Sequence, residues 1–521
     1  MLAPSSLEGA RFVDTHLSLL VFVGDRVYKL RKAVHFGFVD FTSREAREAD
    51  CHREVELNRR LAPDVYLGVV DIVSDGRPID HMVVMRRLPE ERRLATMVRS
   101  GTAQDEHVRA ISHLLASFHA GASRSSRIDR SGTPERLYRS WESHYAETDR
   151  FRGTLLDPGV DDQIRRLVGR YLLGRDDLFF RRIELGAICD GHGDLQAEDV
   201  FCLEDGPRIL DCLEFDDELR YGDVLADLAF LVMDLERLGA TELADRLVVL
   251  YREFTGCELP LSLMHFYCAS RAYVRTKVSC LRYEQEPAVG TDEIRRLHDL
   301  CRTFLERARV RLVLVGGLPG SGKSTLAGRL ALDAGAVVLS SDEIRKELVG
   351  LPANVPAPAS FREGLYAKES TLDTYRTMLG RAELLLCNGE SVILDASWAD
   401  AELRRLAGVV AERTASDLTE VRCTAPPALM VERVESRRLG ESGPSDATVE
   451  ILRAMAAHFD LWPDAAEIDT RQSPEDCGLQ ALALLREEPH GSGDGAEAPD
   501  GEGATGGDPA GPPRRQGSGS G

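Results

Sequence analysis

The sequence predicts an α+β domain followed by an α/β domain that is built on a parallel sheet. Two strand pairs with turn signals flank one helical segment within about the first 90 residues. Helical periodicity then dominates from about residue 91 to residue 309, and strands alternate with helices from residue 310 onward. Such alternation is typical of a parallel sheet with helices on its faces, and 521 residues are too many for one ordinary core.

The first region predicts a small sheet with one helix against it. Residues 17–30 form a strand pair that turns at a Gly-Asp pair, and residues 66–88 form another that turns at "SDGR". Between them, residues 43–61 have helical periodicity, and Glu54 falls on the apolar face of that helix. Because an unpaired inward carboxylate is costly, Glu54 needs a partner.

A stretch rich in acidic residues interrupts the helical region. It reads "DGHGDLQAEDVFCLEDGPRILDCLEFDD" over residues 190–217, and its middle predicts a hairpin. Asp194 and Asp211 stand on either side of that hairpin, which can bring the two carboxylates together. Such a pair suits magnesium phosphate chemistry, in which one carboxylate accepts a hydroxyl proton and the other binds the metal. The alternative is an acidic surface hairpin.

A phosphate-binding motif opens the α/β region. "GLPGSGKS" over residues 317–324 fits GxxxxGK[ST] and stands between an apolar strand and a helix, as the motif requires. Its glycines let the backbone wrap phosphates, Lys323 reaches the β and γ phosphates, and Ser324 ligates magnesium. We therefore predict a nucleotide site, against the alternative of a glycine-rich turn. The candidate residues are Gly317, Leu318, Pro319, Gly320, Ser321, Gly322, Lys323, Ser324 and Thr325.

Two acidic residues follow at predicted strand ends. In "SSDEIRKEL", Asp342 ends a predicted strand and Arg345 lies one helical turn later on the same side. Asp342 is suited to accept the proton of an attacking hydroxyl, and Arg345 to hold an acceptor phosphate or carboxylate. The alternative role for Asp342 is a helix cap. Asp395 ends the apolar strand "SVILD", the position of an acid that orients magnesium.

Two groups of arginines allow two interpretations each. Arg433 and Arg437 are four residues apart on a predicted helix, where they either close over the phosphates as a lid or form a solvated face. Arg271, Arg275 and Arg282 follow one stripe of the predicted helix "RAYVRTKVSCLR". They form either a cationic wall for an acidic substrate or for the second domain, or again a solvated face.

Composition excludes several classes of protein. The net charge of -21 argues against sequence-independent binding to nucleic acid, which needs a basic surface. The eleven cysteines show no CxxC pair and no metal-ligand spacing, as in a reducing cytosol. The sequence has no signal-peptide pattern and no run of about 18 apolar residues, so we expect a cytoplasmic protein that does not span a membrane. Residues 487–521 lack aromatics and predict a disordered tail.

The α/β region resembles the small P-loop kinases that phosphorylate hydroxyl groups, such as polynucleotide 5′-kinase, gluconate kinase and chloramphenicol phosphotransferase. The P-loop and "SSDEIR" carry the resemblance, which covers residues 310 to about 485. It implies phosphoryl transfer with Asp342 as the base, and it does not name the acceptor.

The first region resembles the aminoglycoside phosphotransferase-like kinases, which have an α+β protein-kinase-like fold. "HGDL" matches their catalytic loop, "ILD" their metal segment and "GDVLADLA" their GDxxxDLA segment. Lys29 lies where such a kinase carries its phosphate-pairing lysine, and lysine is rare in this arginine-rich chain. The resemblance implies that Lys29 pairs with Glu54, that Asp194 is the base and that Asp211 binds the metal.

By the same resemblance, Asp223 and Asp227 are mainly structural. Two features depart from the pattern: no GxGxxG loop precedes Lys29, and Asp199 stands where HxDxxxxN has asparagine. Aspartate still offers a hard oxygen, so Asp199 is a candidate magnesium ligand whose charge should strengthen the dependence on divalent metal. The alternative is a pseudokinase lobe.

The whole chain resembles the bacterial bifunctional phosphotransferase/ATP-binding family. The resemblance implies an aminoglycoside phosphotransferase-like domain over residues 1–300, with its N-lobe over about 1–90, and a P-loop kinase domain over 310–486. We therefore expect two nucleotide sites with ATP and Mg²⁺ as cofactors, and as the acceptor a hydroxyl of a small polar metabolite, such as a sugar. Two alternatives stay open: a regulatory switch in which one ATP-bound domain gates the other or a partner, and a polynucleotide 5′-kinase, against which the net charge argues. The sequence does not fix the oligomeric state.

Overall fold

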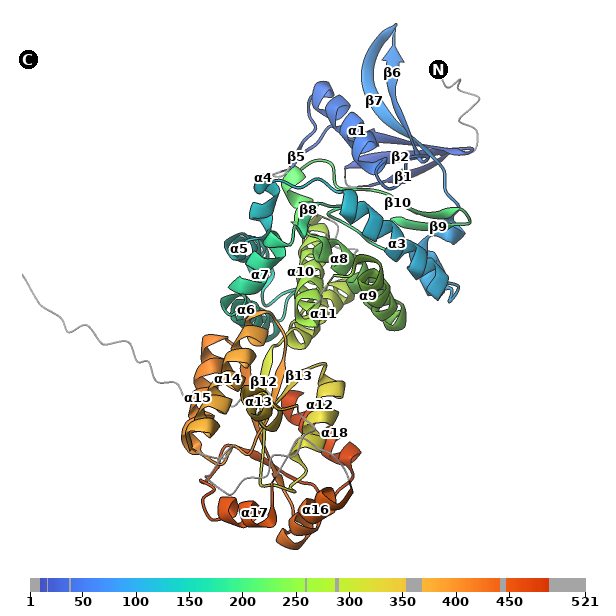
Figure 1. Cartoon of the computed structure of the whole chain (residues 1–521). Coiled ribbons are helices and arrows are strands. Elements are labelled where there is room, and N and C mark those ends of the chain that lie inside the picture. Colours follow the sequence, from blue (N-terminus) through green and yellow to red (C-terminus); the bar gives the residue numbers. More distant parts are fainter. Residues whose placement is uncertain are drawn as a thin grey trace, which may run out of the picture.

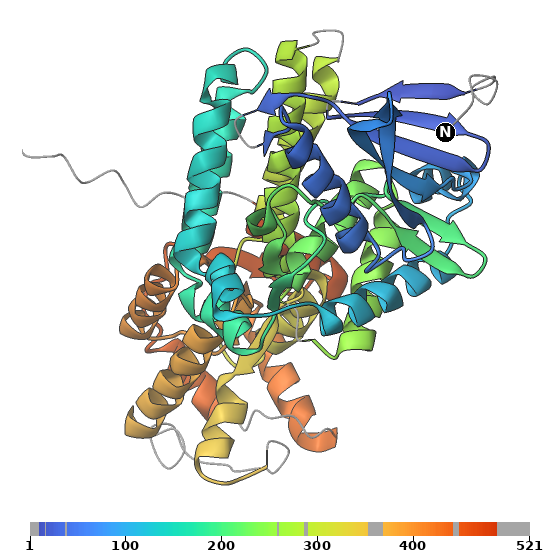
Figure 2. The same cartoon turned by 90° about the horizontal axis from the view of Figure 1, so that it is seen from above.

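An N-terminal sheet, a helical middle part and a C-terminal sheet follow one another along the molecule (Figure 1). Seen from above, the N-terminal sheet lies to one side of the long green and yellow-green helices (Figure 2). The computed structural model describes residues 10–15, 17–36, 39–257, 260–285, 290–352, 368–440 and 447–486.

The N-terminal sheet has the strand order β1-β2-β3-β7-β6, and every pair is antiparallel. Its strands are β1 (Arg11–Asp14), β2 (Ser18–Val23), β3 (Arg26–Arg31), β6 (Tyr66–Ser74) and β7 (Arg77–Arg86), and the short pair β4 (His35–Phe36) and β5 (Val39–Asp40) lies between β3 and α1 (Arg44–Asn58). Helix α1 packs against β6 and β7, and Ser43 caps it by accepting from the Ala46 amide. Both predicted hairpins are confirmed, and β1 is an additional edge strand that we did not predict.

Helices form most of the middle part, as predicted. They are α2 (Leu94–Arg99), α3 (Asp105–Gly121), α4 (Ser126–Asp129), α5 (Pro134–Thr148), α6 (Pro158–Leu173), α7 (Asp176–Glu184), α8 (Val224–Arg237), α9 (Thr241–Thr255), α10 (Leu261–Gln285) and α11 (Thr291–Arg307). The strands among them are β8 (Ile188–Asp190), which pairs with β11 (Tyr221–Asp223), and β9 (Val200–Leu203), which pairs with β10 (Gly206–Ile209). The β9–β10 pair is the hairpin that the acidic stretch predicts. Helix α8 is buried over most of its length and lies in the apolar core.

The C-terminal sheet is parallel, with the order β13-β14-β12-β15-β16. Its strands are β12 (Arg311–Gly316), β13 (Val337–Ser340), β14 (Val392–Asp395), β15 (Asp417–Thr424) and β16 (Ala466–Asp469). The helices of this part are α12 (Lys323–Ala334), α13 (Ser341–Leu348), α14 (Lys368–Cys387), α15 (Ala401–Arg413), α16 (Pro427–Gly440), α17 (Val449–Ala456) and α18 (Pro474–Arg486). The predicted fold class is confirmed. Because all five strands run the same way, their carboxyl ends meet at one edge, where ligands bind in such sheets.

The helical part contacts the C-terminal sheet at the opposite edge, where the strands begin. Three residues separate α11 from β12. Asp417, the first residue of β15, accepts from Arg309 at 2.5 Å and lies 2.9 Å from the Arg170 guanidinium. The Ser262 hydroxyl donates to the Gly389 carbonyl, just before β14, at 2.7 Å. One apolar cluster runs through both parts, so they share a packed junction.

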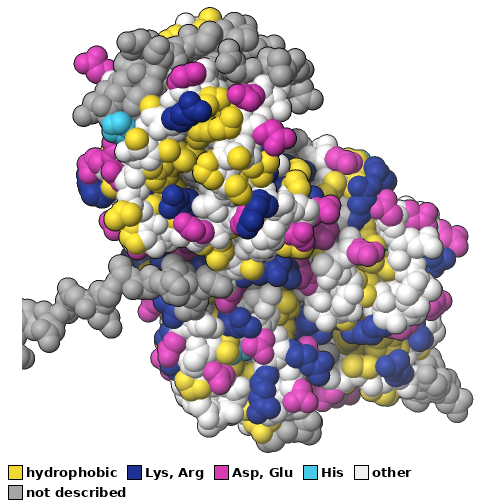
Figure 3. Space-filling view, turned by 90° about the horizontal axis from the view of Figure 1, so that it is seen from below, with side chains coloured by type: hydrophobic (Ala, Val, Ile, Leu, Met, Phe, Trp, Pro, Cys, Tyr) yellow, Lys and Arg dark blue, Asp and Glu magenta, His cyan; other side chains and the backbone are white. Residues whose placement is uncertain are grey.

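Three observations bear on the surroundings of the protein. Among the described helices, none combines the length and the apolar character needed to cross a membrane. On the face that Figure 3 shows, the basic and acidic side chains of the described residues intermingle. The tail predicted over residues 487–521 lies outside the described residues.

Asp417→Ala should loosen the junction, because it takes a buried carboxylate away from the Arg309 guanidinium. Breaking a buried pair from one side costs about 3–5 kcal/mol. We expect a lower thermal midpoint and faster proteolysis between the two parts. The control is Glu402→Ala, which removes an exposed pair with Arg405 and should leave both measurements unchanged. An unchanged midpoint for Asp417→Ala would show that the pair does not hold the junction.

Candidate active sites

Lys29 and Glu54 form an ion pair beneath the N-terminal sheet. Lys29 lies in β3 opposite Val83 of β7, and its Nζ is 2.8 Å from Glu54 Oε1. Glu54 is fully buried on α1, so the helix presents its carboxylate to the strand. Burial alone lowers the pKa of Lys29, but the carboxylates of Asp211 and Glu54 outweigh burial and raise it well above its usual value. Lys29 is therefore a permanent cation.

Asp211 brings the middle part of the chain to the same lysine. Its Oδ1 is 2.7 Å from Lys29 Nζ, and its amide donates to Tyr66 Oη at 3.1 Å. Asp211 follows β10 with a φ of 62°, a left-handed conformation that a residue other than glycine keeps only where its surroundings hold it. The charge of Lys29 lowers the pKa of Asp211 below its usual range. Strand β3, helix α1 and the loop after β10 thus meet at the ammonium group of Lys29.

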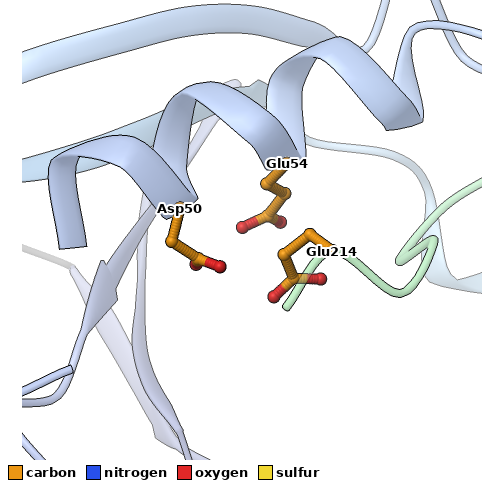
Figure 4. Close-up of side chains that lie close together, drawn as sticks. All are labelled: Asp50, Glu54 and Glu214. Atoms are coloured by element: carbon orange, nitrogen blue, oxygen red, sulfur yellow. The ribbon is translucent and has the colours of Figure 1, made fainter. Parts of the chain in front are cut away.

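Arg31 is a second cation of this site, and no sequence motif indicates it. It donates to Asp50 at 2.5 Å and to Glu54 at 2.8 Å, and it also contacts the Glu214 carboxylate. Figure 4 shows Asp50 and Glu54 on α1 with Glu214 approaching from the loop after β10. The three carboxylates are close enough to hold a metal ion, but the Arg31 guanidinium already binds all of them. We call these four residues the Arg31 cluster. Burial raises the pKa of Glu214 to about 7 in spite of Arg31.

The buried carboxylate of Asp227 holds the backbone of the loop that carries Asp194. Asp227, on α8, accepts from the amides of His192 at 2.5 Å and Gly193 at 2.9 Å. Burial opposes its ionisation, yet His119 and the His192 amide hold the pKa of Asp227 well below its usual range. The carboxylate therefore serves to fix the loop.

Asp223 has a structural role of the same kind. Its carboxylate binds the Arg182 guanidinium through two hydrogen bonds of 2.7 and 2.8 Å. It also caps α8 by accepting from the Leu225 amide at 2.9 Å. Both aspartates of the GDxxxDLA segment thus bind the protein framework, as the resemblance implies.

Asp194, Asp199 and Asp211 gather negative charge beside the β9–β10 hairpin. Asp194 accepts from the Gln196 side chain at 2.9 Å. The Asp199 backbone donates to the Gln196 carbonyl at 3.1 Å and accepts from the Leu210 amide at 2.9 Å. Burial raises the pKa of both Asp194 and Asp199, and the charge of Asp211 raises both further. Their ligand atoms do not all come within 4.8 Å of one another, as those of Asp50, Glu54 and Glu214 do, so the structure brings the three predicted carboxylates near one another without assembling a closed metal site.

The P-loop connects β12 to α12 in a conformation that only glycine allows. Gly320 and Gly322 have φ values of 80° and 89°, and a Cβ on Gly320 would lie 2.5 Å from the Met430 carbonyl oxygen. Helix α12 begins at Lys323 without a side-chain cap, which leaves its first amides to a ligand. Within the described part of the chain, the buried Ser321 hydroxyl has no hydrogen-bond partner. These features fit the phosphates of a nucleotide.

Asp395 and Asp342 belong to the same edge of the sheet as the P-loop. Asp395 ends β14 level with Val315 of β12, and it is buried. Asp342 lies in the first turn of α13, two residues after β13 ends, and not at the strand end as predicted. It accepts from Arg345 at 2.6 Å, so the two residues that we predicted on one side of the helix are in contact.

Arg433 braces the P-loop from the side of α16. Its guanidinium donates to the Gly320 carbonyl at 3.2 Å and to the Thr470 hydroxyl and carbonyl at 3.0 and 2.8 Å. The Thr470 hydroxyl in turn donates to the Ser321 carbonyl at 2.7 Å. In this arrangement Arg433 is neither a lid nor a solvated residue. The side chain of Arg437 lies outside the described residues.

A lysine–glutamate pair facing an acidic hairpin, followed by a P-loop on a parallel sheet, defines a protein with two kinase-like folds. Residues 312–462 match the family described as an AAA domain. Over 475 residues the chain is 41% identical to an uncharacterized protein of Mycobacterium tuberculosis, a match that covers 91% of this chain and 95% of the relative. A protein of Mycobacterium bovis matches to the same extent. The chain belongs to the family of these mycobacterial proteins, and the two-domain kinase-like family predicted from its sequence is confirmed.

Three solved structures are similar to parts of the chain. A choline/ethanolamine kinase family protein of Mesorhizobium loti is 16% identical with a TM-score of 0.37, over 57% of this chain and 88% of that one. A sugar kinase of Janibacter is 24% identical with a TM-score of 0.26, over 34% of this chain and 96% of that one. An APS kinase of Mycobacterium tuberculosis is 23% identical with a TM-score of 0.27, over 34% of this chain and 99% of that one.

Arg31→Met should destabilise the N-terminal lobe by about 3–5 kcal/mol, because three carboxylates lose their common cation. Without Arg31 the folded-state pKa values of Asp50 and Glu214, which burial already raises, rise further above their unfolded values. The loss of stability should therefore be largest at about pH 8 and should shrink as pH falls and the groups become protonated. Chemical denaturation at about pH 8 and about pH 5.5 measures both effects.

Two controls accompany this variant. Arg31→Lys should restore part of the stability, and Arg53→Met, which removes partly exposed pairs with Glu56 and Asp217, should cost less than about 1 kcal/mol. Equal losses for Arg31→Met and Arg53→Met, or a loss that grows on acidification, would contradict the role of the Arg31 cluster.

Proposed function

We propose that this protein is an ATP-dependent phosphotransferase with two nucleotide sites, each of which passes the γ-phosphate of ATP to a hydroxyl of a small polar metabolite. The observation that carries the proposal is that Lys29 contacts both Glu54 and Asp211, at 2.8 and 2.7 Å. This contact joins the two lobes on the kind of cation that kinases use to hold ATP phosphates. The P-loop and the uncapped start of α12 support the second site.

At the first site, Asp194 is suited to be the general base. A hydroxyl oxygen of the acceptor attacks the γ-phosphorus, the bond from that phosphorus to the β,γ-bridging oxygen breaks, and ADP leaves. Asp194 takes the hydroxyl proton, and its raised pKa brings it closer to the operating pH, which favours proton transfer. Lys29 holds ATP phosphates. Asp199 and Asp211 would hold Mg²⁺, which neutralises phosphate charge when it is bound.

At the second site, residues at the edge where the parallel strands end take the corresponding roles. Lys323 and the P-loop amides hold the ATP phosphates, and Asp342 accepts the proton of the attacking hydroxyl. The Arg345 guanidinium, 2.6 Å from Asp342, orients that carboxylate and is also a partner for an acceptor phosphate or carboxylate. Ser324 and Asp395 would hold Mg²⁺ there.

The acceptors in this proposal are small molecules and not nucleic acids. The net charge of -21 supports this choice, because nucleic acid is held mainly by basic surface. The proposed compartment is the cytoplasm, which the eleven cysteines support because none of them forms a disulfide.

Variants of the full chain separate the two sites. Lys323→Ala removes a phosphate contact and should lower transfer at the P-loop by about 10²–10³-fold. In that background, Asp194→Ala should lower the remaining transfer by about 10²–10⁴-fold, because it removes the base. The measurement is mass spectrometry of the metabolites that the pure protein newly phosphorylates with ATP and magnesium.

The matched control is Asp205→Ala, an exposed aspartate of the same hairpin that pairs with Arg208. It should leave all products in place. Slow ATP hydrolysis without any phosphorylated product would favour the regulatory switch over the enzyme. Transfer that survives Asp194→Ala in the Lys323→Ala background would identify the first domain as a pseudokinase.

Asp199→Asn should keep the first site active with a changed requirement for magnesium or manganese. Asparagine retains an oxygen ligand and removes one of three neighbouring negative charges. In the Lys323→Ala background, the metal concentration for half-maximal rate should move by about threefold or more. Asp211→Ala should instead eliminate transfer. If Asp199→Asn is as inactive as Asp211→Ala, the aspartate is required as such and this account of it is wrong.

A further inference from the structure

Three arginines of α10 lie beside the Asp194 loop and take no part in the chemistry described above. Arg271, Arg275 and Arg282 are four and seven residues apart, a spacing that puts them along one stripe of the helix. The sequence alone leaves two interpretations of this stripe, a cationic wall or a solvated face. The contacts of Arg271 and the charges of Arg275 and Arg282 bear on this choice.

Arg271 fixes the stripe against α8. Its Nε donates to the Ala226 carbonyl at 3.1 Å, and its guanidinium lies 5.1 Å from the centre of the Phe230 ring. Ala226 directly precedes Asp227, whose carboxylate holds the two amides just before Asp194. Arg271 therefore connects the arginine stripe to α8, and Asp227 connects α8 to the loop that carries the proposed base, Asp194.

Arg275 and Arg282 carry charge that the described protein does not neutralise by direct contact. Within the ranges that the structure describes, neither has a hydrogen bond or an ion pair, whereas Lys277 of the same helix pairs with Glu147 at 3.1 Å. The charge of Arg275 lowers the pKa of Asp194 more than any other neighbouring charge does, and the charge of Arg282 also interacts with Asp194. Arg275 follows Arg271 by one helical turn, so it belongs to the side of α10 that Arg271 directs toward α8.

An acceptor that gives its proton to Asp194 has to extend over the part of the protein next to Asp194, where the arginine stripe lies. Its hydroxyl must come within about 3 Å of the carboxylate, so the rest of a small molecule lies within a few further ångströms. In the proposed function Lys29 of the N-terminal sheet holds the ATP phosphates, whereas the two arginines belong to a helix of the middle part. This division leaves the two arginines for the acceptor.

We propose that Arg275 and Arg282 form the acceptor subsite of the first site, and that this acceptor carries a phosphate or a carboxylate in addition to its hydroxyl. The inference rests on the proposed function of the Asp194 site. A guanidinium binds either anion through two parallel hydrogen bonds. In a chain with a net charge of -21, an anionic metabolite needs such a local cationic surface in order to approach.

The test uses the full chain with Lys323→Ala, so that only the first site transfers phosphate. Acceptors are offered in sets that share hydroxyls and differ in charge, beginning with glucose, gluconate, glucose 6-phosphate and glucosamine. We expect products from anionic members alone, with the comparison of gluconate and glucose 6-phosphate separating carboxylate from phosphate. Arg275→Ala should raise the KM of the anionic acceptor by at least about tenfold, with less than about a twofold change in kcat.

Two further variants make the test specific. Arg275→Lys should recover part of the lost affinity, because it keeps the charge without the planar fork. Arg296→Ala removes an exposed arginine of α11 that has no ion pair in the described part of the chain, and it should change nothing. Equal use of neutral and anionic acceptors, or a KM that Arg275→Ala leaves unchanged, overturns the inference and leaves the proposed function standing.

A binding measurement judges the subsite without catalysis. Inorganic phosphate is titrated by calorimetry into the Lys323→Ala protein saturated with magnesium and a non-hydrolysable ATP analogue. We expect binding that weakens by at least about tenfold when Arg275→Ala and Arg282→Ala are combined. No binding, or binding that this pair of substitutions leaves unchanged, overturns the inference. Binding that behaves as expected, in a protein that yields no Asp194-dependent product, supports the subsite and refutes the proposed function.

Discussion

The pairing of two strand cations with four carboxyl groups is the interaction on which the first site depends. Lys29 and Arg31 are two residues apart on β3, so both side chains leave the same face of the strand. Their partners come from α1 and from the loop after β10. A buried charge without its partner is costly. Moving β3, α1 or the loop after β10 away from the other two would leave at least one buried charge without its partner. The lobe and the loop therefore hold each other in place.

Lys29, Asp211 and the Arg31 cluster together give the site more acidic than basic side chains. Four carboxyl groups face two cations, and burial raises the pKa of Asp50 and Glu214 although Arg31 binds both. Asp211 stays ionised because Lys29 is next to it. ATP is itself an anion, so in the proposed function its approach to Asp194, Asp199 and Asp211 would need a divalent cation to offset the repulsion. The proposed dependence on metal would then follow from the charge balance of the framework as well as from the ligands themselves.

Local patterns in the sequence were enough to predict much of the fold and part of the site. Turn signals located the hairpins, the motif located the P-loop, and the helical period placed Glu54 inside. Arg31 was not predicted, because every half-buried strand has a residue two positions from Lys29 and that position alone does not indicate a role. Its partner Glu214 is 183 residues away in sequence. Arg433 was a candidate from the sequence, but its contact with the Gly320 carbonyl was not foreseen, because that contact spans 113 residues. Such contacts depend on tertiary packing, which neither period nor composition contains.

The arrangement of the two parts also decides how the two proposed sites can communicate. The helical part meets the sheet where its strands begin, at Asp417 and Gly389, whereas the P-loop and Asp395 lie where the strands end. The six residues of β12 alone span about 20 Å, at about 3.3 Å per residue. The two proposed sites thus lie on opposite sides of the junction, so a product of one would have to reach the other through solvent. Any coupling between them has to pass through the packed junction, where a shift of α11 against β15 would alter the contact between Arg309 and Asp417.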